Sequence, residues 1–171
     1  MTRAAVHHDP EMTTSSALTT EQVWHAIEKA SFAVLSEVNA EGEPRSSGVV
    51  YKALGHRLYT AVAADSWKAR QIAAHGRVAV TVTVPRGGLL SLVMPIPPAT
   101  ISFHATANVR PATAPECKEL LAKLGSMLPK ERRDTASIVE IEPQGAFLTY
   151  GIEVPLTRMR EPAAARARVP V

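Results

Sequence analysis

Ser66, Lys68 and Arg70 stand at the start of a predicted helix, where their types and spacing suit the binding of an anion. Asp65 or Ser66 is a good N-cap, and Gly76 suits the end of the same helix. The first turn of a helix has unpaired backbone N–H groups and carries a partial positive charge. A phosphate there would meet these donors together with a hydroxyl, an ammonium and a guanidinium. The ordinary alternative is a capped surface helix whose Lys and Arg side chains are solvated.

Three predicted strands must position this helix, and they cover residues 46–52, 57–62 and 78–84. The first two form a hairpin about a turn at residues 54–56, and the helix joins the second strand to the third. Because side chains alternate along a strand, Ser47, Val49 and Tyr51 share one face of the first strand. The helix start therefore follows directly on the returning strand of the hairpin.

The string Ser66-Trp67-Lys68-Ala69-Arg70-Gln71-Ile72, followed by the strand at residues 78–82, closely resembles a segment of the pyridoxamine 5′-phosphate oxidase-like family, S-R-K-x-x-Q-[LI]…R-V-x-[LV]. Residues 45–52 and 58–60 fall where that family has its cofactor strand and an aromatic-Thr pair. The resemblance is clearest over residues 32–84 and continues more weakly through residues 100–110. It implies an antiparallel split β-barrel that binds flavin mononucleotide (FMN), or in some branches a deazaflavin coenzyme, at a homodimer interface.

The resemblance also implies which residues form the cofactor site. Those along the isoalloxazine ring would be Ser47, Gly48, Val49 and Val50. Those near the phosphate would be Thr60, Ser66, Trp67 and Lys68, with Arg70 as a further cation. Candidates on the substrate side are Lys52, Met94 and Pro95. The last two belong to the apolar, proline-rich segment 85–98, which we expect to border the pocket, to pack on a partner subunit, or both.

Two departures from the family pattern bear on the activity. Ser47 and Trp67 stand where pyridoxamine phosphate oxidases have phosphate-binding Arg residues. Each lost charged hydrogen bond weakens phosphate binding by about 1 to 3 kcal/mol, and Arg70 is the candidate replacement for one of them. The C-terminal region also lacks the Arg-x-His pattern used on the vitamin substrate, so we do not expect oxidation of pyridoxamine phosphate.

Composition excludes several other classes of protein. The 171 residues suffice for one domain, and the single cysteine, Cys117, can form neither an intramolecular disulfide nor a cysteine metal site. No long apolar run or signal-like start is present, so we expect no membrane association and a cytoplasmic location. The net charge of +3 comes without a basic stripe, which argues against nucleic acid. No metal site or catalytic triad is recognisable, and the catalytic residues stay unknown.

The remaining sequence predicts a mainly β domain with peripheral helices. A flexible arm at residues 1–18 precedes the flavin-binding domain at 19–152, and a tail at 153–171 trails or packs on the partner subunit. Capping boxes at Thr19 and Thr113 predict two further helices. The last two strands, residues 137–143 and 146–150, should be joined by a tight Pro-Gln-Gly connection.

These expectations lead to one principal function and two alternatives. The principal one is an FMN-dependent oxidoreductase that acts on an unknown small organic substrate. The first alternative keeps the fold and uses a deazaflavin coenzyme, whose polyanionic tail would use Lys68 and Arg70. The second is a non-catalytic protein that binds or stores flavin or another planar ligand.

Overall fold

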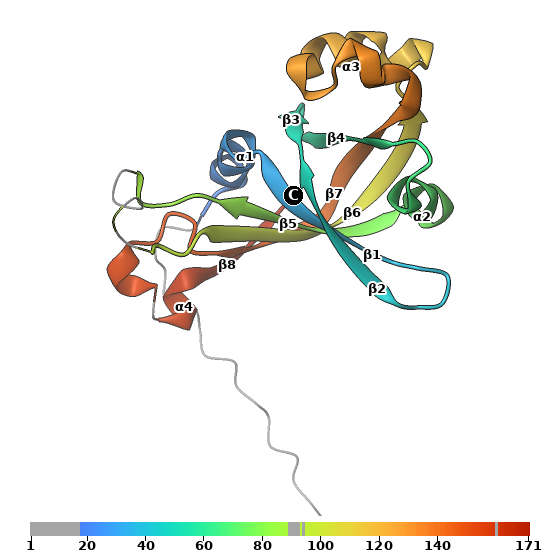
Figure 1. The fold of residues 1–171 in the computed structure, drawn as a ribbon. Coiled ribbons are helices and arrows are strands. Elements are labelled where there is room, and N and C mark those ends of the chain that lie inside the picture. The colour runs from blue at the N-terminus through green and yellow to red at the C-terminus, as the bar shows by residue number, and fades with distance from the viewer. Residues whose placement is uncertain (1–17, 89–92, 94, 160) are drawn as a thin grey trace, which may run out of the picture.

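The fold is that of a split β-barrel, made from one antiparallel sheet that curls on itself (Figure 1). The computed structural model describes residues 18–88, 93, 95–159 and 161–171. The order of the hydrogen-bonded strands is β2-β1-β5-β6-β7-β4-β3, and β8 pairs with the last part of β7, residues 146–150. The strands are β1 (Phe32–Val38), β2 (Pro44–Val50), β3 (Lys52–Leu54), β4 (Arg57–Ala63), β5 (Arg77–Val84), β6 (Ala99–Pro111), β7 (Ala136–Tyr150) and β8 (Arg166–Pro170).

Short helices surround this sheet. The α-helices are α1 (Thr20–Lys29), α2 (Trp67–His75), α3 (Lys118–Leu124) and α4 (Pro162–Ala165). The 3-10 helices are η2 (Pro115–Cys117), η3 (Gly125–Met127), η4 (Lys130–Thr135) and η5 (Leu156–Arg158). Figure 1 shows α3 and its neighbours over the end of the barrel at β3 and β4, and α2 beside β1 and β6. The predicted fold class is therefore confirmed.

The barrel core follows from the alternation of side chains along the strands. In β1, β5 and β6 every second residue points inward, so that Leu35, Val80 and Phe103 are buried. The inward Phe147 of β7 meets Phe103 and Trp24 edge to face, with ring centroids 5.3 and 5.4 Å apart. Trp24 comes from α1, which begins with the capping box predicted at Thr19 and seals this part of the core.

Helix α2 forms as the sequence predicts. The hydroxyl of Ser66 accepts a hydrogen bond from the amide of Ala69, and Gly76 ends the helix at a φ of 63°, where glycine is favoured. Ala69 and Ile72 are buried, whereas Ala73 is exposed. The helix is therefore held by a narrow apolar edge, and its two ends are accessible.

The predicted hairpin of residues 46–52 and 57–62 is wrong in one respect. The first strand divides at Tyr51, whose amide donates to Ser31 and whose hydroxyl donates to the carbonyl of Ile27. These bonds turn the chain inward, so β2 pairs with β1 and only the short β3 pairs with β4. The chain thus passes from one edge of the sheet to the other at this point, which creates the split of the barrel.

Two further predictions are wrong at the level of single elements. Residues 143–145 are no turn, because β7 runs unbroken past them and pairs with β6 on both sides of a bulge, where Gly145 has a φ of 75°. Thr113 caps no helix, because Pro115 takes the first position of η2 and makes Ala114 the N-cap residue. Cys117 follows there and is buried in the second apolar cluster.

The C-terminal residues form a strand of the sheet. Residues 166–170, which we expected to trail or to pack on a partner, form β8 along β7 of the same chain. Their alternation allows this, since Val169 is buried against the core while its neighbours are exposed. The predicted arm lies outside the described residues except for Leu18, whose side chain packs on the core. The division into arm, domain and tail stays a prediction.

Candidate functional site

A pocket of about 400 Å³ opens where β2 and β4 diverge, next to the first turn of α2. We call it the split pocket, and its lining residues are Gly48, Val49, Val50, Thr60, Ala61, Val62, Ala63, Ser66, Trp67, Lys68 and Met127. Seven of the nine predicted cofactor residues are among them; the other two are Ser47 and Arg70. The fold therefore gathers residues of two strands and a helix at one place, and their role in cofactor binding stays a prediction.

The hydroxyl groups of the split pocket are engaged with the protein itself. Thr60 Oγ1 donates to the carbonyl of Val50 at 2.8 Å and so ties β4 to β2 across the split. Ser66 Oγ donates to the carbonyl of Ala63 at 2.7 Å while it accepts from the amide of Ala69. Both side chains therefore fix the wall of the pocket, and in this arrangement their protons are not available to a ligand.

The donors that the split pocket offers come from the first turn of α2. The amides of Ala69 and Arg70 bond to Ser66, whereas those of Trp67 and Lys68 have no acceptor among the described residues. The ammonium of Lys68 adds a charge, although partial burial lowers its pKa and the nearby Glu37 opposes that shift. Two amides and one ammonium at a helix N-terminus suit an anionic group.

Glu37 lies behind Lys68 and is the most unusual side chain near the site. It is 6% exposed, and neither carboxylate oxygen has a hydrogen-bond partner among the described residues. Burial raises the pKa of Glu37, and the positive charges of Lys68 and His75 work in the opposite direction. The burial of Glu37 could not be predicted from the sequence, because an acidic side chain near the end of a strand is normally solvated.

The two predicted cofactor residues outside the pocket lie close to it. The hydroxyl of Ser47 is buried without a partner in the described part of the chain. Arg70 is exposed and donates to the carbonyl of Asp65, so its guanidinium is directed at the loop before α2. Neither residue supplies a cation to the pocket in this arrangement.

Sequence reasoning missed several residues of the site. Arg45, two positions before Ser47, places its guanidinium 5.6 Å from the centre of the Trp67 ring. Because side chains alternate along β2, Arg45 and Ser47 lie on the same face, and this alternation could have identified Arg45 as a neighbour of the predicted residue Ser47. Ala61, Val62 and Ala63 continue β4 beyond Thr60, whereas Met127 reaches the pocket from η3, far away in sequence. Such a long-range contact has no local signature.

The substrate-side candidates are not brought together. Lys52 is exposed and donates to the carbonyl of Lys123 at 2.7 Å, which ties β3 to the end of α3. Pro95 is exposed outside the split pocket, and Met94 lies outside the described residues. The assignment of a substrate side to these three residues therefore stays a prediction.

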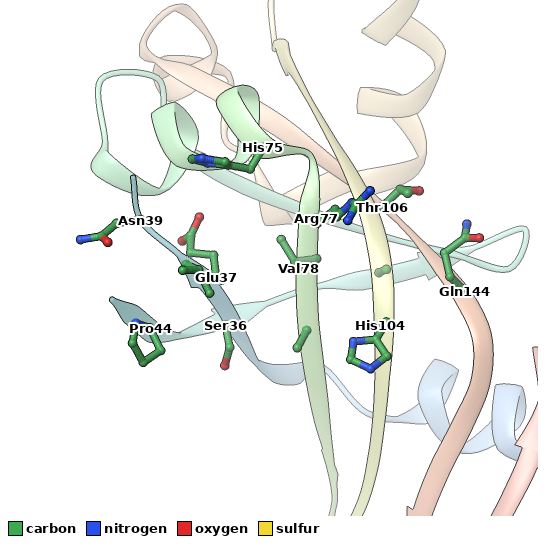
Figure 2. Close-up of a pocket in the computed structure, with 13 residues that line it drawn as sticks. Ser36, Glu37, Asn39, Pro44, His75, Arg77, Val78, His104, Thr106 and Gln144 are labelled. Atoms are coloured by element: carbon green, nitrogen blue, oxygen red, sulfur yellow. The ribbon is translucent and has the colours of Figure 1, made fainter. Parts of the chain in front are cut away.

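A larger pocket, of about 690 Å³, lies at the other end of α2. We call it the outer pocket, and its lining residues are Ser36, Glu37, Val38, Asn39, Pro44, His75, Arg77, Val78, Ala79, His104, Ala105, Thr106 and Gln144. Figure 2 shows Glu37 and His75 at one side, and His104 and Thr106 projecting from β6. None of the predicted cofactor residues lines the outer pocket.

The described residues contain neither a metal-binding cluster nor a membrane-spanning helix. Among the described residues, no three His, Cys, Asp or Glu side chains lie close enough together to hold a metal ion. In the same part of the chain, no helix has both the length and the apolar character needed to cross a membrane.

Comparison with solved structures supports the fold. The heme storage protein HutZ of Vibrio cholerae is 13% identical, with a TM-score of 0.62 over 80% of this chain and 96% of that one. A pyridoxamine 5′-phosphate oxidase-related, FMN-binding protein of Nostoc punctiforme is 13% identical, with a TM-score of 0.59 over 87% of both chains. A protein described as an F420 reductase is 18% identical, with a TM-score of 0.53 over 79% of this chain and 98% of that one.

Sequence comparison identifies the family. No curated protein sequence matches this chain. The sequence model of the family described as pyridoxamine 5′-phosphate oxidase matches residues 19–150, which span α1 to β7. This range contains every residue that lines the split pocket or the outer pocket. The chain therefore belongs to the pyridoxamine 5′-phosphate oxidase family.

Proposed function

We propose that this protein is an FMN-dependent oxidoreductase that acts on a small organic substrate other than pyridoxamine phosphate. The observation that carries the proposal is the split pocket, because seven residues assigned to the cofactor by family resemblance line one cavity of the described structure. The family match and the FMN-binding neighbour support the same conclusion.

The residues of the split pocket fit FMN in their chemistry. Val49, Val50 and Val62 supply apolar walls for a planar ring. At the helix end, the free amides of Trp67 and Lys68 and the ammonium of Lys68 suit a phosphate. The buried Ser47 hydroxyl, which lacks a partner, is a further polar group for a ligand at the edge of this site.

Bound FMN would supply the transfer of a hydride or of electrons, which no side chain can provide. The chain's own residues have the tasks of binding and orientation. The Thr60 to Val50 hydrogen bond keeps β2 and β4 at a fixed separation, which sets the width of the ring site. The first turn of α2 would hold the phosphate.

A deazaflavin coenzyme is the first alternative cofactor. A structural neighbour described as an F420 reductase supports this alternative. A competitive titration of FMN against the deazaflavin separates the two, since a tenfold preference corresponds to about 1.4 kcal/mol.

A non-catalytic binding protein is the second alternative, and one feature of the split pocket favours it. Lys68 is the only ionisable side chain among the residues that line the pocket in the described structure. General acid or base chemistry would therefore depend on Lys68, on the substrate or on a partner subunit. One of the structural neighbours, HutZ, is described as a heme storage protein.

Two measurements test the proposal. Purified protein titrated with FMN should show saturable quenching of flavin fluorescence at micromolar concentration, and absence of binding to both FMN and the deazaflavin would overturn it. A bound flavin should then turn over when a reduced nicotinamide or the reduced deazaflavin is supplied. Binding without turnover by any donor would favour the storage alternative.

We also propose a cytoplasmic homodimer with the cofactor between the subunits. The split pocket is open to solvent on one side, and the exposed Val50 at its edge leaves apolar surface that a second copy could cover. Light scattering at micromolar concentration should give twice the mass of the chain. A monomer would contradict this part of the proposal.

A further inference from the structure

Arg45 occupies a position that the chemistry of the split pocket leaves unexplained. It lies on β2, and its guanidinium carbon is 5.6 Å from the centre of the Trp67 ring. Trp67 is the first residue of α2 and lines the split pocket. Arg45 therefore places a permanent positive charge over a pocket residue, at the end of the pocket where the free helix amides lie.

The charge of Arg45 is not used elsewhere in the described structure. The guanidinium makes no ion pair and no side-chain hydrogen bond within residues 18–88, 93, 95–159 and 161–171. Its cross-strand partner is Glu37, yet the charges that act on that buried carboxylate are those of Lys68 and His75. Arg45 thus lies over an aromatic ring, at cation–π distance, although a carboxylate stands opposite it on the next strand.

The other candidate cation is directed away from the pocket. Neither Arg45 nor Arg70 lines the split pocket itself, but Arg70 donates to the carbonyl of Asp65, whereas Arg45 lies over Trp67, which does line it. Ser47, the neighbour of Arg45 on the same face of β2, has a neutral hydroxyl and supplies no charge. The family resemblance places Arg at the positions of Ser47 and Trp67. Arg45 is close to both, because it precedes Ser47 by two residues on β2 and lies over the ring of Trp67.

From these contacts we infer that Arg45, carried on the face of Trp67, binds the anionic end of the ligand in the split pocket. Trp67 then positions the guanidinium of Arg45 through a cation–π contact. The charge of Arg45 substitutes for the charge that an Arg at position 67 would have. The inference rests on the proposed function, because it needs a ligand with a phosphate. It also replaces Arg70, the cation favoured by sequence spacing, with a residue of the neighbouring strand.

The guanidinium of Arg45 is able to contact a ligand. Arg45 is exposed, and its guanidinium N–H groups have no hydrogen-bond acceptor among the described residues. A phosphate bound at the first turn of α2 would meet the amides of Trp67 and Lys68, and Arg45 lies over the first of these residues.

The test compares FMN with riboflavin, which has the same ring and no phosphate, by fluorescence titration of the purified full chain. Arg45→Ala should lower the affinity for FMN about tenfold or more, the effect of a charged hydrogen bond, and leave riboflavin affinity unchanged. Arg45→Lys, which keeps the charge, should restore part of the loss. Arg132→Ala, a matched exposed Arg on η4, should bind both ligands like the parent.

A double variant examines the role of Trp67. If Trp67 acts by holding Arg45, then Trp67→Ala combined with Arg45→Ala should reduce the preference for FMN over riboflavin no further than Arg45→Ala alone. Trp67→Phe keeps an aromatic face and should retain most of the preference.

Three outcomes would overturn the inference: full FMN affinity in Arg45→Ala, an equal loss of FMN and riboflavin binding, or additive losses in the double variant. A failure of the proposed function is seen separately, in the parent protein. A parent that binds neither flavin, or that binds FMN no better than riboflavin, shows that no phosphate is held, before any variant is made.

Discussion

The split pocket and the outer pocket lie at opposite ends of the same helix. Ser66, Trp67 and Lys68 at the start of α2 face the smaller one, and His75 at its end borders the larger one. A helix favours anions at its N-terminus and cations at its C-terminus. The smaller pocket thus has the free amides and the ammonium, whereas the larger one has a buried carboxylate and mostly apolar walls.

If the cofactor binds in the split pocket as we propose, the direction of dipoles and charges is a better guide to the binding site than the volume of the cavity. The outer pocket holds about 690 Å³ against about 400 Å³ in the split pocket. Yet the family residues and the free donors gather in the smaller one. Glu37 and Lys68 lie between the two pockets, so changes at these residues and at the anchor of α2 can separate the contributions of the two ends.

The largest effect is expected at Ile72, because its buried side chain anchors α2 and hence one wall of both pockets. Ile72→Ala should lower the free energy of unfolding by about 2 to 5 kcal/mol, measured by chemical denaturation. FMN binding should weaken together with the stability of the helix. Ala73→Ser, at the exposed next position, should change stability by less than about 0.5 kcal/mol. An Ile72→Ala protein of parental stability would show that α2 is held by other contacts.

Lys68→Ala should affect the split pocket alone. Removal of the ammonium should cost about 1.5 to 3 kcal/mol of FMN affinity, the contribution of a charged hydrogen bond, while the fold stays intact. Riboflavin should bind the variant and the parent equally, because it has no phosphate. Lys118→Ala on α3 serves as the control and should change neither affinity. Equal FMN binding by Lys68→Ala and the parent would place the phosphate elsewhere.

Glu37→Gln changes a residue that lines the outer pocket and should affect the stability of the protein. Because burial raises the pKa of Glu37 above 4.5, the folded state holds the proton more tightly than the unfolded state. The carboxylate therefore destabilises the fold increasingly as the pH rises above its unfolded pKa, and the penalty is absent at lower pH. Glu37→Gln should raise the free energy of unfolding at pH 7 by about 1 kcal/mol or more and have little effect at pH 3.

The control for this pH dependence is Glu119→Gln, a change at an exposed position of α3. It should leave the stability unchanged at both pH values. A Glu37→Gln protein that is less stable than the parent at pH 7 would show that the carboxylate is paired in solution, for example with Lys68. The measurement is chemical denaturation at each pH.

The sequence predicted those parts of the structure that local patterns determine. Helix α2 could be predicted from Ser66 and Gly76, because caps act within a few residues, and β5 was expected at residues 78–84. The division of the strand at Tyr51 could not be predicted. It depends on bonds from Tyr51 to Ser31 and Ile27, which become neighbours only in the folded barrel.

The site was predictable to a similar extent. The family string located Ser66, Trp67 and Lys68, which share one helix turn, and the split pocket contains all three. The contact between Arg45 and Trp67 joins a strand to a helix that begins 17 positions after that strand's end, and spacing along the chain gives no sign of it. Arg70 had the right spacing, yet its guanidinium bonds to a nearer acceptor, the carbonyl of Asp65.

The smallest effect is therefore expected at Arg70. Because the guanidinium is exposed and bonded to a loop carbonyl, Arg70→Ala should change FMN affinity and stability by less than about 0.5 kcal/mol each. A single hydrogen bond from an exposed side chain is weakened by competing water, which accounts for the small size of the change. Isothermal titration with FMN should compare the affinity of Arg70→Ala with that of Arg45→Ala. Should Arg70→Ala lose about tenfold in FMN affinity, Arg70 must leave Asp65 when the ligand binds, and the cation of the split pocket would come from α2 rather than from β2.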